Sequence, residues 1–321
     1  MNELKSYGVE KKIIESVLGC CGDKPLKLDE LEKIFELRLA GIVWYLGAQS
    51  VLCIEDDLKC ILDNIRKINI KRNLAILQEI KKIDAFLEKK HISHLWLKGI
   101  RDVICHEKMI GLRKMIDSDL LVSRHVDIKS IMKEYGIKQG NVTIDGNLYF
   151  AETEEDVLLA EQGHYEYIPF VQILPVEKFE PHGLPKNIIN RYHIFEQYGR
   201  FITNFVLDIH HALATGLPFK EGIQNKSMPT MESVDDLWYC MNKSYYEVWK
   251  GDKKDLQMVL FTMMKYRNSN LKMQDITNRL KQISPELYNE NVFLFYEGLV
   301  NGEEEVINEF IQCIQEKLNV S

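Results

Sequence analysis

The spacing of apolar residues changes twice along the chain, and this change constrains the fold more than any other feature. Helical spacing dominates up to about residue 90 and returns after about residue 216. One helical face in the first part holds Leu31, Ile34, Phe35, Leu39, Ile42 and Leu46. Between the two parts, short apolar runs rich in β-branched and aromatic residues predict strands. We therefore expect an α+β chain with an N-terminal helical region at 1–90, a core at 91–215 and a C-terminal helical region at 216–321.

Four short runs in the middle region predict strands of one small mixed sheet. They are HLWLKG (94–99), SDLLVS (118–123), YEYIPFVQIL (165–174) and FITNFVLDIH (201–210). Residues 100–109 predict a helix between the first two runs, and 127–135 predict another that ends at Gly136. Asp145-Gly146, in the centre of 141–150, is typical of a hairpin turn. From about residue 216 onward, helical spacing returns.

Composition narrows the class of protein. The net charge of −7 and the sequence pI near 5.8 argue against extended DNA binding. The seven cysteines are scattered without a Cys-x-x-Cys pair, which predicts free thiols in a reducing compartment. The N-terminus lacks a signal-peptide pattern, and no apolar run approaches the roughly 20 residues that cross a bilayer. We expect a cytoplasmic protein without membrane contact. The basic residues Arg66, Lys67, Lys71 and Arg72 predict a solvated helix face.

Two aspartates open the second predicted strand. Asp117 and Asp119 are two residues apart, so on a strand their carboxylates stand on the same side. Like charges so close repel, and a divalent cation removes the conflict; magnesium favours one or two carboxylates together with phosphate oxygens. Asp208, in Val206–His211, could add a third carboxylate, with His210 on the same face. The alternatives are a solvated strand end for the pair, and a strand end with a satisfied histidine for the third position.

A second element of the pattern is Lys98-Gly99, at the end of the first predicted strand. A glycine that opens a helix lets the backbone approach a ligand, and the first helical N–H groups suit a phosphate. Lys98 and Arg113 would add positive charge, arginine in a fork. The alternatives are a plain turn at Gly99 and a solvated Lys98.

In this order the residues resemble the bacterial family of uncharacterised nucleotidyltransferases, within the polymerase-β-like nucleotidyltransferase superfamily. The resemblance rests on Leu97-Lys98-Gly99, then Arg113, Met115, Asp117, Asp119, Leu120, Leu121 and Val122, then Gly163-His164-Tyr165-Glu166, then Asp208-Ile209-His210. It covers about residues 35–215. The superfamily usually has Gly-Ser where this chain has Lys98-Gly99, so Lys98 would replace the serine contact. Ser118 stands in place of an aliphatic residue, and Arg101 and Asp102 in place of small apolar ones.

The resemblance implies a polymerase-β-like nucleotidyltransferase core carrying the three carboxylates, flanked by helices. It implies transfer of a nucleoside monophosphate from an NTP such as ATP to an acceptor, with release of pyrophosphate and two Mg2+ ions. Asp117, Asp119 and Asp208 would bind metal and be catalytic, and Lys98, Gly99 and Arg113 would bind the nucleotide. His164 and Glu166 would face the acceptor, and His210 would orient Asp208. The acceptor stays open between a small molecule, a peptide, a protein and an RNA end. The rival classes are a non-catalytic nucleotide-binding module and a metal-dependent phosphohydrolase.

Overall fold

The computed structural model of the chain divides into two compact units. It describes residues 9–19, 24–123, 125–143, 146–150, 153, 157, 161, 166–180, 184–214, 217–218, 231–251 and 255–319. One unit combines Met1–Asp63 with Ser233–Ser321, and the other is Asn64–Glu232. The three-region division expected from the sequence stays a prediction about domain boundaries.

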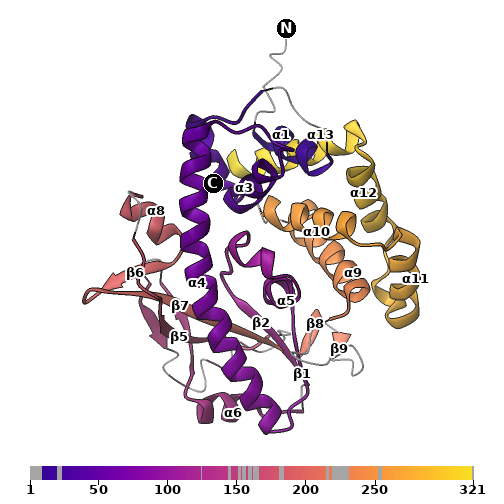
Figure 1. The fold of residues 1–321 in the computed structure, drawn as a ribbon. Helices are drawn as coiled ribbons and strands as arrows, with labels where there is room; N and C mark the ends of the chain where they lie inside the picture. The colour runs from indigo at the N-terminus through magenta and orange to yellow at the C-terminus, as the bar shows by residue number, and fades with distance from the viewer. Residues whose placement is uncertain are drawn as a thin grey trace. The chain divides into compact units, whose positions relative to one another are not determined.

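The second unit is built on a seven-stranded mixed sheet in the order β1-β2-β7-β5-β3-β4, with β6 also paired to β7. Figure 1 labels β1, β2, β5, β6 and β7 of this sheet. Its strands are β1 (His94–Trp96), β2 (Ser118–Val122), β3 (Lys138–Val142), β4 (Leu148–Phe150), β5 (Phe170–Pro175), β6 (Ile194–Gln197) and β7 (Arg200–His210). A separate hairpin joins β8 (Ala212–Ala214) to β9 (Leu217–Pro218). The helical segments in this part are α5 (Lys98–Cys105), η2 (Glu107–Gly111), α6 (Ile128–Tyr135) and α8 (Lys186–Arg191).

The long strand β7 organises this sheet. One of its edges pairs with β5 along Ile202–Leu207. The other edge is shared, because β6 pairs antiparallel with its first half and β2 pairs parallel with its second half. The pairing of β2 with β7 is the one parallel pairing among the described strands.

Helices α4 (Asp56–Lys89) and α6 cover one face of the sheet. The buried cluster there contains Ile76, Ile80, Ile83 and Leu87 of α4, Ile128 and Met132 of α6, Leu120 and Val122 of β2, and Phe205, Leu207 and Ile209 of β7. Side chains alternate between faces along a strand. The residues between these apolar ones, including Asp119 and Asp208, therefore face the opposite side of the sheet.

The first unit is helical in its described part. It contains α1 (Val9–Val17), η1 (Leu28–Glu30), α2 (Leu31–Glu36), α3 (Ala40–Ala48), the start of α4, α9 (Ser233–Ser244), the π-helical turn η3 (Tyr245–Trp249), α10 (Leu256–Asn268), α11 (Met273–Ile283), η4 (Pro285–Leu287), α12 (Glu290–Asn301) and α13 (Glu304–Asn319). Apolar side chains of these helices form its core, and the buried Asp235 of α9 accepts two 3.0 Å hydrogen bonds from Arg279 of α11.

The predicted fold class is confirmed, with a small mixed sheet flanked by helices. The apolar face at 31–46 is divided between α2 and α3, because Arg38 adopts a positive φ of 59° between them. The helix expected at 100–109 ends at Cys105, where His106 becomes extended and a 3-10 turn follows. Gly146 has the positive φ of a hairpin turn, whereas Asp145 lies outside the described residues.

Two further predictions concern the cysteines and the membrane. Cys53, Cys60, Cys105, Cys240 and Cys313 are free thiols, while Cys20 and Cys21 lie outside the described residues. Among the helices of the described chain, none combines the length and the apolar character needed to cross a bilayer.

Candidate functional site

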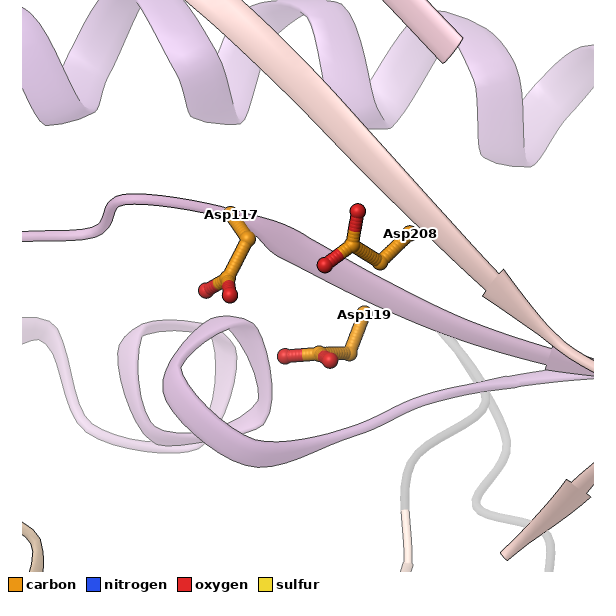
Figure 2. Close-up of side chains that lie close together, drawn as sticks. All are labelled: Asp117, Asp119 and Asp208. Atoms are coloured by element: carbon orange, nitrogen blue, oxygen red, sulfur yellow. The ribbon is translucent and has the colours of Figure 1, made fainter. Parts of the chain in front are cut away.

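Three carboxylates from two segments of the chain meet on the face of the sheet opposite the apolar cluster. Asp117 directly precedes β2, Asp119 lies within β2, and Asp208 lies opposite Asp119 in the parallel register with β7. One carboxylate oxygen from each lies within 4.8 Å of the others, and Figure 2 shows the three side chains pointing toward one another. The convergence follows from two features of strands. Residues two apart share a face, and residues paired in register lie side by side.

The three groups differ in their tendency to hold a proton. Burial, followed by the charges of Asp119 and Asp117, raises the pKa of Asp208 to about 8. Asp117 is exposed on one side, yet desolvation by the surrounding protein and the charge of Asp119 raise its pKa as well. Burial alone would raise the pKa of Asp119, but Lys98 and His210 hold it far below its ordinary value. The protein therefore keeps one carboxylate ionised and leaves the other two short of positive charge.

This shortage of charge fits a divalent cation. The Oδ1 atom of Asp208 is buried and accepts no hydrogen bond from the described residues. A buried carboxylate oxygen normally has a donor, because an unmet acceptor costs about 1–3 kcal/mol. Hard oxygen ligands at this separation suit Mg2+ or Mn2+. The residues present thus match the chemistry of a hard-cation site.

The imidazole of His210 lies between the carboxylates of Asp119 and Glu166. Nε2 of the buried His210 lies 2.9 Å from Oδ1 of Asp119, and its Nδ1 lies 3.4 Å from Oε2 of Glu166. Glu166 also forms an isolated antiparallel bridge with His210. The sequence predicted that His210 would orient Asp208. The imidazole forms a hydrogen bond with Asp119 on the neighbouring strand, and the role of His210 in orienting Asp208 stays a prediction. His164 lies outside the described residues.

The residues expected to bind phosphate lie next to the carboxylates. Lys98 starts α5 with a positive φ of 49°, and its Nζ forms an ion pair with Oδ1 of Asp119. A Cβ atom on Gly99 would lie 3.0 Å from Nε of Arg113, so the glycine makes room for that guanidinium. Arg113 Nη1 donates to Oδ2 of Asp102 over 3.1 Å. The assignment of these residues to nucleotide binding stays a prediction.

Sequence reasoning missed two contributors to this site. Asp102 was noted only as a departure from the family pattern, yet it is fully buried and anchors Arg113. Arg72 was expected on a solvated helix face, and this expectation was wrong. Lys67 is exposed, but Arg72 is fully buried between Asn69 and Asn73. The available signal was the i, i+3, i+4 spacing of Asn69, Arg72 and Asn73, which places three polar groups on one helical face.

The comparisons with known proteins give one match. The family model described as "Uncharacterised nucleotidyltransferase" matches residues 32–296, a range that includes every residue of the site. No curated protein and no solved structure gives a significant match to the chain.

Proposed function

The chain belongs to the uncharacterised nucleotidyltransferase family, and from this premise we propose that it transfers a nucleoside monophosphate from an NTP to an acceptor, with magnesium held by Asp117, Asp119 and Asp208. The observation that carries the proposal is the convergence of these three carboxylates within 4.8 Å. These carboxylates would hold two metal ions, which would stabilise the charge on the entering and leaving oxygens.

The reaction forms a bond between an acceptor oxygen and the α-phosphorus, and breaks the bond from that phosphorus to the oxygen of the leaving pyrophosphate. Bound magnesium would supply neutralising charge for the phosphate oxygens. Lys98 and Arg113 bind the β- and γ-phosphates, and Asp102 keeps the guanidinium of Arg113 in place. Asp208 is the proposed proton acceptor for the attacking hydroxyl, because it lies on β7 beside the other two carboxylates and would be ionised once a cation is bound.

The strand order supports a direction for the attack. Lys98 follows β1, and the sheet continues from β1 through β2 to β7. The leaving pyrophosphate would thus lie on the β1 side of the cluster. In an in-line displacement the acceptor enters from the opposite side. That side is β7, which carries Asp208.

The test is incubation with each labelled NTP and Mg2+ against a panel of small molecules, peptides, proteins and RNA ends. We expect label transfer and pyrophosphate release by the wild type, loss of both with EDTA, and loss of both in Asp117→Asn. Glu196→Gln is the matched control, since it removes an exposed carboxylate of the same sheet outside the cluster. Nucleotide binding without pyrophosphate release would support a binding module instead. Release of nucleoside monophosphate without an acceptor would support a phosphohydrolase.

A further inference from the structure

Helix α4 directs three buried polar side chains at the chain segment that leads into the metal site. Asn69, Arg72 and Asn73 are at most 2% exposed. Their spacing places them on one side of the helix, next to the face whose apolar residues cover the sheet. Polar groups buried so completely need partners, and here the partners are backbone carbonyls.

The two asparagines bind the same short stretch of backbone. Nδ2 of Asn69 donates to the carbonyl oxygens of Gly111 at 3.1 Å and Arg113 at 3.0 Å. Nδ2 of Asn73 donates to the carbonyl oxygens of Ile110 at 2.6 Å and Arg113 at 2.8 Å. The carbonyl of Arg113 is therefore held from two sides.

This stretch leaves regular structure after Gly111, the last residue of η2. Residues 112–117 lie between η2 and β2, so neither a helix nor a strand ladder accounts for their carbonyls. Gly111 allows the close approach to α4. A Cβ atom there would lie 2.9 Å from both Cγ of Arg66 and Cγ1 of Ile70. The segment nevertheless carries Arg113 and Asp117, two residues of the proposed site.

Arg72 holds the same segment nearer to the metal site. Its Nη1 donates to the carbonyl oxygen of Met115, two residues before Asp117, and lies 3.3 Å from Oδ1 of Asn73. Its Nε has no hydrogen-bond partner among the described residues. Burial lowers the pKa of this guanidinium to about 9, and the charge of Asp117 opposes that lowering.

Burying the charged side chain of Arg72 costs more free energy than one hydrogen bond to a carbonyl oxygen returns. Replacing a whole buried charged pair with apolar side chains is often neutral or stabilising. The cost is explained if the charge and the hydrogen bond have a task that packing alone cannot perform. The negative group that offsets the charge is Asp117, an expected metal ligand.

We propose that Asn69, Arg72 and Asn73 are positioning residues. They hold the 110–117 segment where Asp117 can bind the metal and Arg113 can bind the triphosphate. The inference rests on the proposed function and deepens it, because it assigns the geometry of the site to a helix that contributes no ligand. Asn69 and Asn73 position Arg113, and Arg72 positions Asp117.

The test is the affinity of the full chain for Mn2+, measured by electron paramagnetic resonance without nucleotide. Loss of a group that orients a metal ligand typically weakens binding 10- to 100-fold. We expect a loss of about that size in Arg72→Met, with an unchanged circular dichroism spectrum and a lower melting temperature, because the carbonyl of the buried Met115 loses this donor. Arg72→Lys, which keeps the charge and one donor, should recover part of the affinity.

Glu79→Gln is the matched control. Glu79 is buried on the same helix and accepts a 2.7 Å hydrogen bond from Tyr135, far along the chain from the 110–117 segment. It should lower the melting temperature and leave the Mn2+ affinity unchanged. Equal affinity in Arg72→Met and the wild type would overturn the inference, as would an equal loss in Glu79→Gln. Failure of the wild type to bind Mn2+, or full binding by Asp117→Asn, would instead overturn the proposed function.

Discussion

Replacing Asp208 with asparagine should stabilise the metal-free protein, and the gain should grow with pH. Asp208 stands beside Asp119 and Asp117, and its burial and their charges disfavour its ionised form. Asparagine has nearly the same shape but carries no charge. The substitution therefore removes the repulsion within the cluster while it leaves the packing of β7 in place.

The size of the effect follows from the two pKa values. The carboxyl titrates near its ordinary value of 3.8 in the unfolded chain and near 8 in the folded one. Below about pH 4 the group is neutral in both states, so the substitution changes little. The wild type loses stability between about pH 4 and pH 8, at about 1.4 kcal/mol per pH unit, and the loss levels off above pH 8 at a bound of roughly 6 kcal/mol. Since Asp208 is half-buried, we expect asparagine to recover about 2 kcal/mol at pH 9.

The assay is urea unfolding and thermal melting in EDTA at pH 6 and pH 9. For a unit of this size, 2 kcal/mol corresponds to a rise in melting temperature of about 4–8 °C. Addition of Mn2+ should reverse the order, because it stabilises the wild type and not Asp208→Asn. Glu196→Gln serves as the control for loss of one negative charge. A variant less stable than the wild type at pH 9 in EDTA, or a gain that does not increase from pH 6, would refute the reasoning.

Three more substitutions follow from the site. Lys98→Met should raise the Mn2+ affinity of the nucleotide-free protein about fivefold, because the ammonium group of Lys98 no longer competes with Mn2+ for Asp119. It should also weaken NTP binding. Titration calorimetry measures both affinities, and unchanged values would contradict the ion pair. Asp102→Asn should raise the KM for NTP more than it lowers kcat and cost about 2 kcal/mol of stability, since Arg113 loses a charged partner; an unchanged KM would exclude a role in phosphate binding. Asn204→Leu should raise the melting temperature by the equivalent of about 1 kcal/mol. Asn204 is buried, and neither Oδ1 nor Nδ2 of its side chain has a hydrogen-bond partner among the described residues. A lower melting temperature would indicate that the side-chain amide binds a buried water.

The parts of the site that the sequence predicted are those that depend on local periodicity. Asp117 and Asp119 were placed on one side of a strand by their two-residue spacing, and Asp208 shares its face of β7 with His210 for the same reason. The turn at Gly136 was predicted equally well, because a glycine at a helix end signals a left-handed residue, here with φ of 103°.

The parts that escaped prediction depend on contacts between distant segments. Arg72 and Lys71 are adjacent basic residues, and Lys71 is partly exposed; the spacing of Arg72 with Asn69 and Asn73 puts it on a polar face of the helix but does not show that this face is buried. The two side chains differ in the direction in which they leave α4. That direction decides burial only because the 110–117 segment packs against the side of the helix that carries Arg72. The partner of His210 escaped for a similar reason, because only the pairing of β2 with β7 reveals that Asp119 lies within its reach.

The register of one parallel pairing decides whether the site exists at all. Leu207 and Ile209 of β7 are fully buried against α4 and α6, while Asp208 between them faces the other way. A slip of β7 by one residue would exchange the faces and bury the carboxylate in the apolar cluster. Burying an unpaired charge among apolar side chains would strongly destabilise the slipped arrangement. The apolar residues on the covered face thus fix the position of the three carboxylates on the opposite face.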